Sequence, residues 1–123
     1  MDTNLNLQNP TFGSYKWTKT AKDRAAKVLT DRQFEVVSNS TSYPLGQVAV
    51  GFCYGQSPKL GRKRMFALLT EISPETGEVL KNVKRIIQQP FEGTYKFILR
   101  TIKTAEKQNE SVQTYYQRIS ELQ

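Results

Sequence analysis

Between Arg62 and Arg85 the chain reads RKRMFALLTEISPETGEVLKNVKR, a pattern that is typical of a β-hairpin. Two stretches rich in apolar residues flank the turn sequence SPETGE. Its proline presets the first central torsion of a type I turn, and Gly77 can adopt the left-handed conformation that closes the turn. The pattern therefore predicts a hairpin in which Ser73 pairs with Glu78.

The predicted pairing also fixes which side chains share a face of the hairpin. Side chains alternate along a strand, so one face should carry three opposing pairs, Leu68 with Val83, Thr70 with Lys81, and Ile72 with Val79. Because this face is mostly apolar, we expect it to be buried in the core.

Charges separate along this hairpin, with glutamates at its tip and basic residues at its open end. With one lysine from the preceding loop, the basic residues form a predicted site, called here the hairpin cluster: Lys59, Arg62, Lys63, Arg64, Lys81, Lys84 and Arg85. Such a cluster would bind nucleic-acid phosphates with release of counterions, and a two-stranded ribbon fits the DNA major groove. The alternative is a solvated surface that protects a sheet edge from aggregation.

The composition points to polyanionic partners and away from catalysis. The chain has 123 residues, a net charge of +7 and no histidine. The charge favours nucleic acid or an acidic protein. The absence of histidine removes the usual general acid–base catalyst at neutral pH, the triads that depend on it and His-containing zinc sites. We find no catalytic or metal motif, and we expect a non-enzymatic protein without a cofactor.

Its single cysteine, Cys53, excludes an internal disulfide, and no apolar stretch approaches the length of a membrane span. The N-terminal sequence has no basic leader or apolar signal region, so we expect a cytoplasmic protein. Cys53 lies among small and apolar residues, where a thiol is usually inert. The neighbouring Phe52 and Tyr54 could stack on bases, but we expect them in the core.

The remaining segments complete an α+β pattern. We expect residues 1–11 to be a flexible arm and residues 12–123 to be a single domain. Phe12, Tyr15 and Trp17 would cover a sheet edge as a short strand or, alternatively, anchor a partner. Apolar periodicity predicts a helix over 20–31, and β-forming residues predict a strand at 33–38.

Three further strands are predicted at 46–54, 63–72 and 78–85, and helices at 94–107 and 110–122 with a break at Gln108-Asn109. The expected fold is thus an N-terminal helix, a four-stranded antiparallel meander and two C-terminal helices on one face. In the strand at 46–54, the small side chains of Ala49, Gly51 and Cys53 share a face, which indicates close packing by a helix.

Both C-terminal helices carry candidate sites. The first has a basic stripe formed by Lys96, Arg100, Lys103 and Lys107, which would extend the hairpin cluster if the two lie on the same side. A membrane-surface role is less favoured, because the apolar face of this helix is needed to cover the sheet. The last helix has an apolar stripe that would dock a partner or pack on the preceding helix: Tyr115, Tyr116, Ile119 and Leu122.

We therefore predict a small basic protein that binds DNA or RNA through the hairpin cluster and the basic stripe. The alternative is a protein-interaction or adaptor subunit, such as a transcription co-regulator or a component of a larger complex. It would use the apolar stripe and the aromatic N-terminal arm to join a larger complex or to form a homodimer, and its positive charge would then complement an acidic protein.

Overall fold

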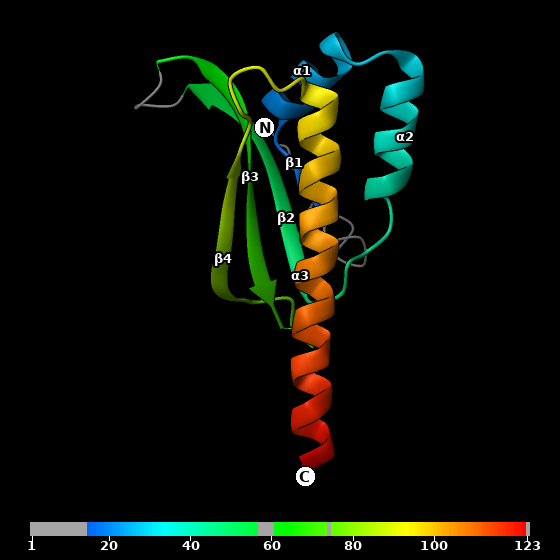
Figure 1. Ribbon diagram of the computed structural model, residues 1–123, viewed down its shortest axis with the longest axis vertical. Helices are drawn as coiled ribbons and strands as arrows, with labels where there is room; N and C mark the ends of the chain where they lie inside the picture. The colour runs from blue at the N-terminus through cyan, green and yellow to red at the C-terminus, as the bar shows by residue number, and fades with distance from the viewer. Residues whose placement is uncertain (1–14, 57–60, 74, 123) are drawn as a thin grey trace.

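The computed structural model describes residues 15–56, 61–73 and 75–122, and within them the chain is an α+β protein with a four-stranded sheet and three helices (Figure 1). The elements in chain order are β1 (Tyr15–Trp17), α1 (Lys19–Val28), α2 (Asp31–Thr41), β2 (Val48–Gln56), β3 (Lys63–Ile72), β4 (Val79–Ile87) and α3 (Thr94–Leu122). The predicted arm at 1–11 and the predicted roles of Phe12 and Lys59 fall outside the described residues.

The predicted hairpin is confirmed as β3 and β4. The Ser73 N–H donates to the Glu78 carbonyl at 2.8 Å, and the Gly77 N–H donates to the Ser73 carbonyl at 2.8 Å. Gly77 has a φ of 74°, the left-handed conformation that a residue with a side chain rarely adopts. Ile72 lies opposite Val79, as predicted.

Beyond that first pair, the predicted register is wrong. Shifts between Leu69 and Thr70 and between Glu71 and Ile72 place extra residues in β4, as in β-bulges. As a result Thr70 lies opposite Asn82, and Leu68 lies opposite Arg85.

The predicted buried face of the hairpin is also wrong. Met65, Ala67 and Leu69 are the buried apolar residues of β3, whereas Leu68 is 40% exposed. Both faces of β3 are apolar, so alternation alone could not say which one the helices cover.

The sheet is mixed, and not the antiparallel meander that the sequence predicted. Its strand order is β1-β2-β3-β4, and β1 pairs parallel to β2 with Tyr15 opposite Val50. The predicted edge-covering strand at Tyr15 and Trp17 is thereby confirmed.

The predicted strand at 33–38 is wrong, because these residues lie in α2. A capping box starts this helix: the Gln33 N–H donates to Thr30 Oγ1 at 3.2 Å, and the Thr30 N–H donates to Gln33 Oε1 at 3.0 Å. These reciprocal bonds satisfy donors that a helix otherwise leaves unpaired at its N-terminus. They outweigh the strand propensity of Phe34, Val36 and Val37.

The core lies between one face of the sheet and the helices. α3 runs along this face, α1 contacts both β2 and α3, and α2 packs against α3 (Figure 1). The rings of Trp17 and Phe52 stack at 4.2 Å within this layer, which confirms Phe52 as a core residue. The expectation that the small residues of β2 meet a helix is wrong, because Val48 and Val50 are the residues that face the core.

α3 is one continuous helix of 29 residues, so the predicted break at Gln108-Asn109 is wrong. Asn109 instead reaches out of the helix, and its Oδ1 accepts a hydrogen bond from the Gln47 N–H at 3.0 Å. Gly46 lies against this contact with a φ of 89°, and a Cβ there would approach the side chains of Asn109 and Gln113 to 3.3 Å or less. The residues that resembled a helix break therefore join α3 to the start of β2.

Candidate functional site

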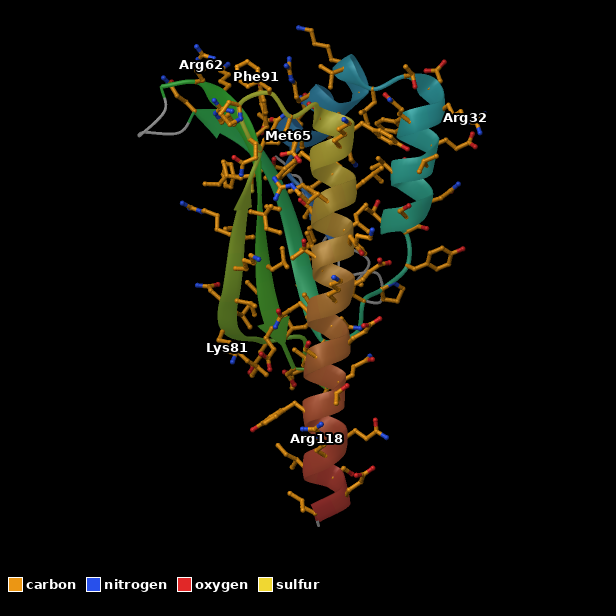
Figure 2. All side chains as sticks on the ribbon, in the orientation of Figure 1. Arg32, Arg62, Met65, Lys81, Phe91 and Arg118 are labelled. Atoms are coloured by element: carbon orange, nitrogen blue, oxygen red, sulfur yellow. The ribbon has the colours of Figure 1, made fainter. Side chains whose placement is uncertain are left out.

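The residues of the hairpin cluster are spread along the hairpin. Arg62, Lys63 and Arg64 lie where β3 begins, and Arg85 lies near the middle of the ribbon, opposite Leu68. Arg62 and Lys81 lie at opposite ends of the sheet (Figure 2). The two bulges move the cations of β4 toward the turn relative to the predicted pairing, so the cluster does not converge at the open end.

Two members of the hairpin cluster interact with other groups of the fold. Lys81 Nζ lies 3.6 Å from a carboxylate oxygen of Glu71, which is itself nearly buried. Arg64 Nη1 donates to the Gln88 carbonyl at 3.4 Å, and its buried Nε has no hydrogen-bond partner in the described part of the chain.

The other described members point to solvent. Arg62, Lys63, Lys84 and Arg85 are exposed, and none lies within 4.0 Å of a carboxylate of the described residues. The Arg85 guanidinium lies over the ring of Phe66, 5.6 Å from its centroid. These four side chains can therefore offer positive charge to a ligand.

Strand pairing defines a second surface, on the side of the sheet away from α3. It is called here the open face, and its described residues are Lys16, Ala49, Gly51, Cys53, Gly55, Arg64, Phe66, Leu68, Thr70, Ile72, Val79, Asn82, Arg85 and Ile87. Leu68 is 40% exposed and Ile87 is 39% exposed. A Cβ built on Gly51 or Gly55 would meet no atom within 4 Å. This face is accessible, carries three cations and has no carboxylate among its described residues.

Cys53 lies on the open face beside Phe66. Burial raises the pKa of its thiol, and the positive charge of Arg85 partly offsets that rise. The raised pKa keeps the thiol protonated at neutral pH, which agrees with an inert cysteine.

The basic stripe of α3 is interrupted by an internal ion pair. Arg100 donates to both carboxylate oxygens of Glu92, at 2.7 and 2.8 Å, and to the Ile87 carbonyl at 3.0 Å. Lys96, Lys103 and Lys107 remain exposed. Because α3 and the open face lie on opposite sides of the sheet, the stripe does not form one continuous surface with Arg64 and Arg85.

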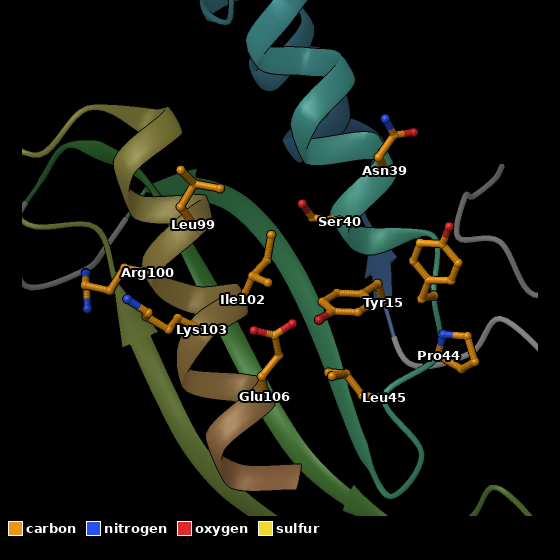
Figure 3. A pocket seen from close by; sticks show the side chains of 11 residues that line it. Tyr15, Asn39, Ser40, Pro44, Leu45, Leu99, Arg100, Ile102, Lys103 and Glu106 are labelled. Atoms are coloured by element: carbon orange, nitrogen blue, oxygen red, sulfur yellow. The ribbon is translucent and has the colours of Figure 1, made fainter. Parts of the chain in front are cut away.

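A groove of about 850 Å³ lies between α2 and α3 (Figure 3). Its lining combines the apolar side chains of Leu99 and Ile102 with Ser40 and Lys103. Tyr15 also lines the groove, and burial together with the negative charge of nearby Glu106 raises its pKa to about 12. Its hydroxyl therefore stays protonated, and no described lining residue forms a nucleophile–base pair with it.

The last turns of α3 extend beyond the sheet (Figure 1). Val112 is the last buried residue of the described helix, whereas Tyr115 is 60% and Leu122 is 86% exposed. The alternative in which 110–122 folds back onto 94–107 is wrong, because both segments belong to one helix. The side chain of Tyr116 falls outside the described residues.

The open face was not predicted from the sequence, and neither was the placement of Lys16, Phe66 and Ile87 on it. The available signal was the apolar character of both faces of β3, since one helical layer can cover only one of them. The exposure of Phe91 was also not predicted: this side chain is fully exposed at the end of the sheet where β3 begins and β4 ends.

No described helix is long and apolar enough to cross a membrane, and no group of described residues has the composition to hold a metal ion. Comparison with protein-family models, with curated proteins and with solved structures gave no match for this chain.

Proposed function

We propose that this chain is a non-enzymatic nucleic-acid-binding protein that contacts phosphates through the β3–β4 hairpin. The observation that carries the proposal is that four exposed cations lie on one hairpin without a carboxylate partner among the described residues: Arg62, Lys63, Lys84 and Arg85. A phosphate backbone supplies the negative charge that these side chains lack within the fold.

Four phosphate contacts would make binding strongly salt dependent. The logarithm of the binding constant would fall with the logarithm of the salt concentration with a slope of about −3, at roughly 0.7 to 0.9 per contact. A binding site that depends on apolar docking alone would show a slope close to zero.

The test is fluorescence anisotropy with labelled single- and double-stranded DNA and RNA at ~50 and ~200 mM salt. The triple variant Arg62→Gln, Lys63→Gln, Lys84→Gln should lose most of the affinity at the lower salt and about three quarters of the salt slope. Arg64 is left unchanged because its guanidinium bonds to the Gln88 carbonyl inside the fold.

A matched triple variant on the helical layer controls for net charge. Lys22→Gln, Lys27→Gln, Arg32→Gln removes three exposed cations from α1 and α2, away from the hairpin. It should retain the affinity and the slope of the wild type. Failure of the wild type to bind any of the four nucleic acids at the lower salt would overturn the proposal.

The competing explanation is that the cations only protect an edge. β4 is a terminal strand of the described sheet and exposes Val79 and Leu80, and lysine and arginine on such a strand oppose pairing with another chain. If this were their sole role, the hairpin triple variant would self-associate in sedimentation velocity, while the wild type would bind no nucleic acid.

A second candidate function is protein interaction through the end of α3. It is favoured by one observation: the helix continues beyond the sheet after Val112 and exposes Leu122 there. An apolar helical face of this kind can dock a partner helix or a second copy of the chain.

A further inference from the structure

We infer that the open face binds single-stranded nucleic acid, with a base against Phe66 and phosphates at Lys16 and Arg85. The inference rests on the proposed function and names the form of nucleic acid and the surface that receives it.

The first step is that this face is accessible. The core lies on the opposite side of the sheet, where α1 and α3 pack, and no described element covers the open face. Leu68 and Ile87 are each about 40% exposed there, next to the half-buried ring of Phe66. Contiguous exposed apolar surface of this kind commonly marks a binding site.

The second step is the sign of the charges. All three charged residues on the described open face are positive: Lys16 on β1, Arg64 on β3 and Arg85 on β4. They frame an apolar centre that contains Phe66 and Leu68. The complementary ligand combines negative charge with flat apolar groups, and a nucleic-acid strand has both.

The third step is the contact between Arg85 and Phe66. The guanidinium lies over the ring, 5.6 Å from its centroid, so a cation and an aromatic ring share one position on the face. A base stacked on Phe66 would take the place of this guanidinium over the ring, and the displaced Arg85 would contact the phosphate of that nucleotide. Stacking on aromatic side chains combined with basic contacts to the backbone is the usual way in which proteins bind single strands.

The shape of the face selects a single strand over a duplex. Gly51, Cys53 and Gly55 form a low strip along β2, between Lys16 on one side and Phe66 on the other. The four strands span about 14 Å, a width over which comparable sheets stack two or three bases. In a duplex the bases are already stacked and paired, so only the phosphates could contact this face.

Binding is tested by fluorescence anisotropy on the full-length chain with labelled oligothymidylate and oligouridylate of about 12 nucleotides and a duplex of equal length. We expect both single strands to bind more tightly than the duplex. Phe66→Leu keeps an apolar side chain but removes the ring, and it should weaken single-strand binding about 5- to 150-fold with little change in salt slope. Arg85→Gln should reduce the magnitude of the slope by about 0.7.

Matched substitutions on the other side of the molecule serve as controls. Tyr43→Leu removes an exposed ring from the loop between α2 and β2, and Arg32→Gln removes an exposed cation from α2. Both should leave single-strand affinity and slope unchanged. A difference between the oligothymidylate and the oligouridylate would show whether DNA or RNA is the preferred form.

A second measurement uses the wild type and does not depend on a variant that may misfold. Cys53, the single cysteine of the chain, lies on the open face between Gly51 and Gly55. Its reaction with a thiol reagent, followed at mildly alkaline pH because burial raises its pKa, should slow several-fold with saturating oligothymidylate and not with the duplex.

The outcomes separate this inference from the proposed function. If the single strands and the duplex bind equally, and Phe66→Leu and Cys53 reactivity show no effect, the inference fails while the hairpin proposal stands. If no nucleic acid binds, both fail. A further outcome is that Cys53 is protected without oligonucleotide. If removal of residues 1–13 or dilution of the protein then exposes it, the open face binds the chain's own N-terminal segment or a second copy, and the inference is overturned.

Discussion

Glu92 joins the end of β4 to α3 through one carboxylate. Besides the two bonds from Arg100, its Oε1 accepts from the Gln89 N–H at 3.0 Å. The hydrogen bond from Arg100 is the main reason that the pKa of Glu92 lies below its ordinary value of 4.5. The unfolded chain therefore takes up this proton at a higher pH than the folded one. The resulting stability is present above about pH 4.5 and is lost as the pH falls through the folded pKa.

Glu92→Gln should consequently lower the free energy of unfolding by about 1.5–3 kcal/mol near pH 7, the range for hydrogen bonds to charged groups. The difference from the wild type should shrink near pH 3, where the wild-type carboxylate is being protonated. Urea unfolding at both pH values measures this difference in stability. As a control, Asp23→Asn breaks the exposed pair with Lys19 and should cost less than about 0.5 kcal/mol at either pH. An equal loss for Glu92→Gln at both pH values would contradict the assignment.

Among the elements, α2 could have been predicted from the sequence, because its start signal is local. A threonine at position 30 followed by Gln33 is the pattern of a capping box, and it precedes the residues that suggested a strand. The continuity of α3 was harder to foresee. Gln108-Asn109 resembles a break, and the partner that gives Asn109 a role, the Gln47 N–H, is 62 residues away in the chain.

The capping box of α2 carries a prediction at this scale. Thr30→Ala removes the acceptor for the Gln33 N–H and should lower the free energy of unfolding by about 1 kcal/mol. Ser38→Ala, an exposed change inside the same helix, also removes a hydroxyl but favours the helix, so it should cost nothing. Urea unfolding followed by circular dichroism compares the two. Equal stability of Thr30→Ala and Ser38→Ala would show that the capping bonds do not hold α2 in place.

For the whole molecule, the sequence predicted the hairpin and its turn but not the face on which the helices pack. The turn depends on Ser73 and Gly77, which bond to groups no more than five residues away in the chain. The position of each cation on β4 depends on two bulges, and the choice of buried face depends on a layer built from α1 and α3. These are consequences of distant packing, so the convergence of the hairpin cluster at the open end of the hairpin was predicted wrongly.

Burial also predicts how stability is distributed over the molecule. Residues 97–105 of α3 lie against the sheet and contribute five buried side chains to the helix layer, whereas after Val112 no described side chain is buried. In hydrogen–deuterium exchange, amides at 101–112 should therefore open only with global unfolding, whereas those at 117–122 should exchange through fraying of the helix end. Amides of the central strands β2 and β3 should be protected like those at 101–112. If amides 117–122 are instead as protected as 101–112 and lose that protection on dilution, the end of α3 is docked on a second copy of the chain. That result would support the protein-interaction function.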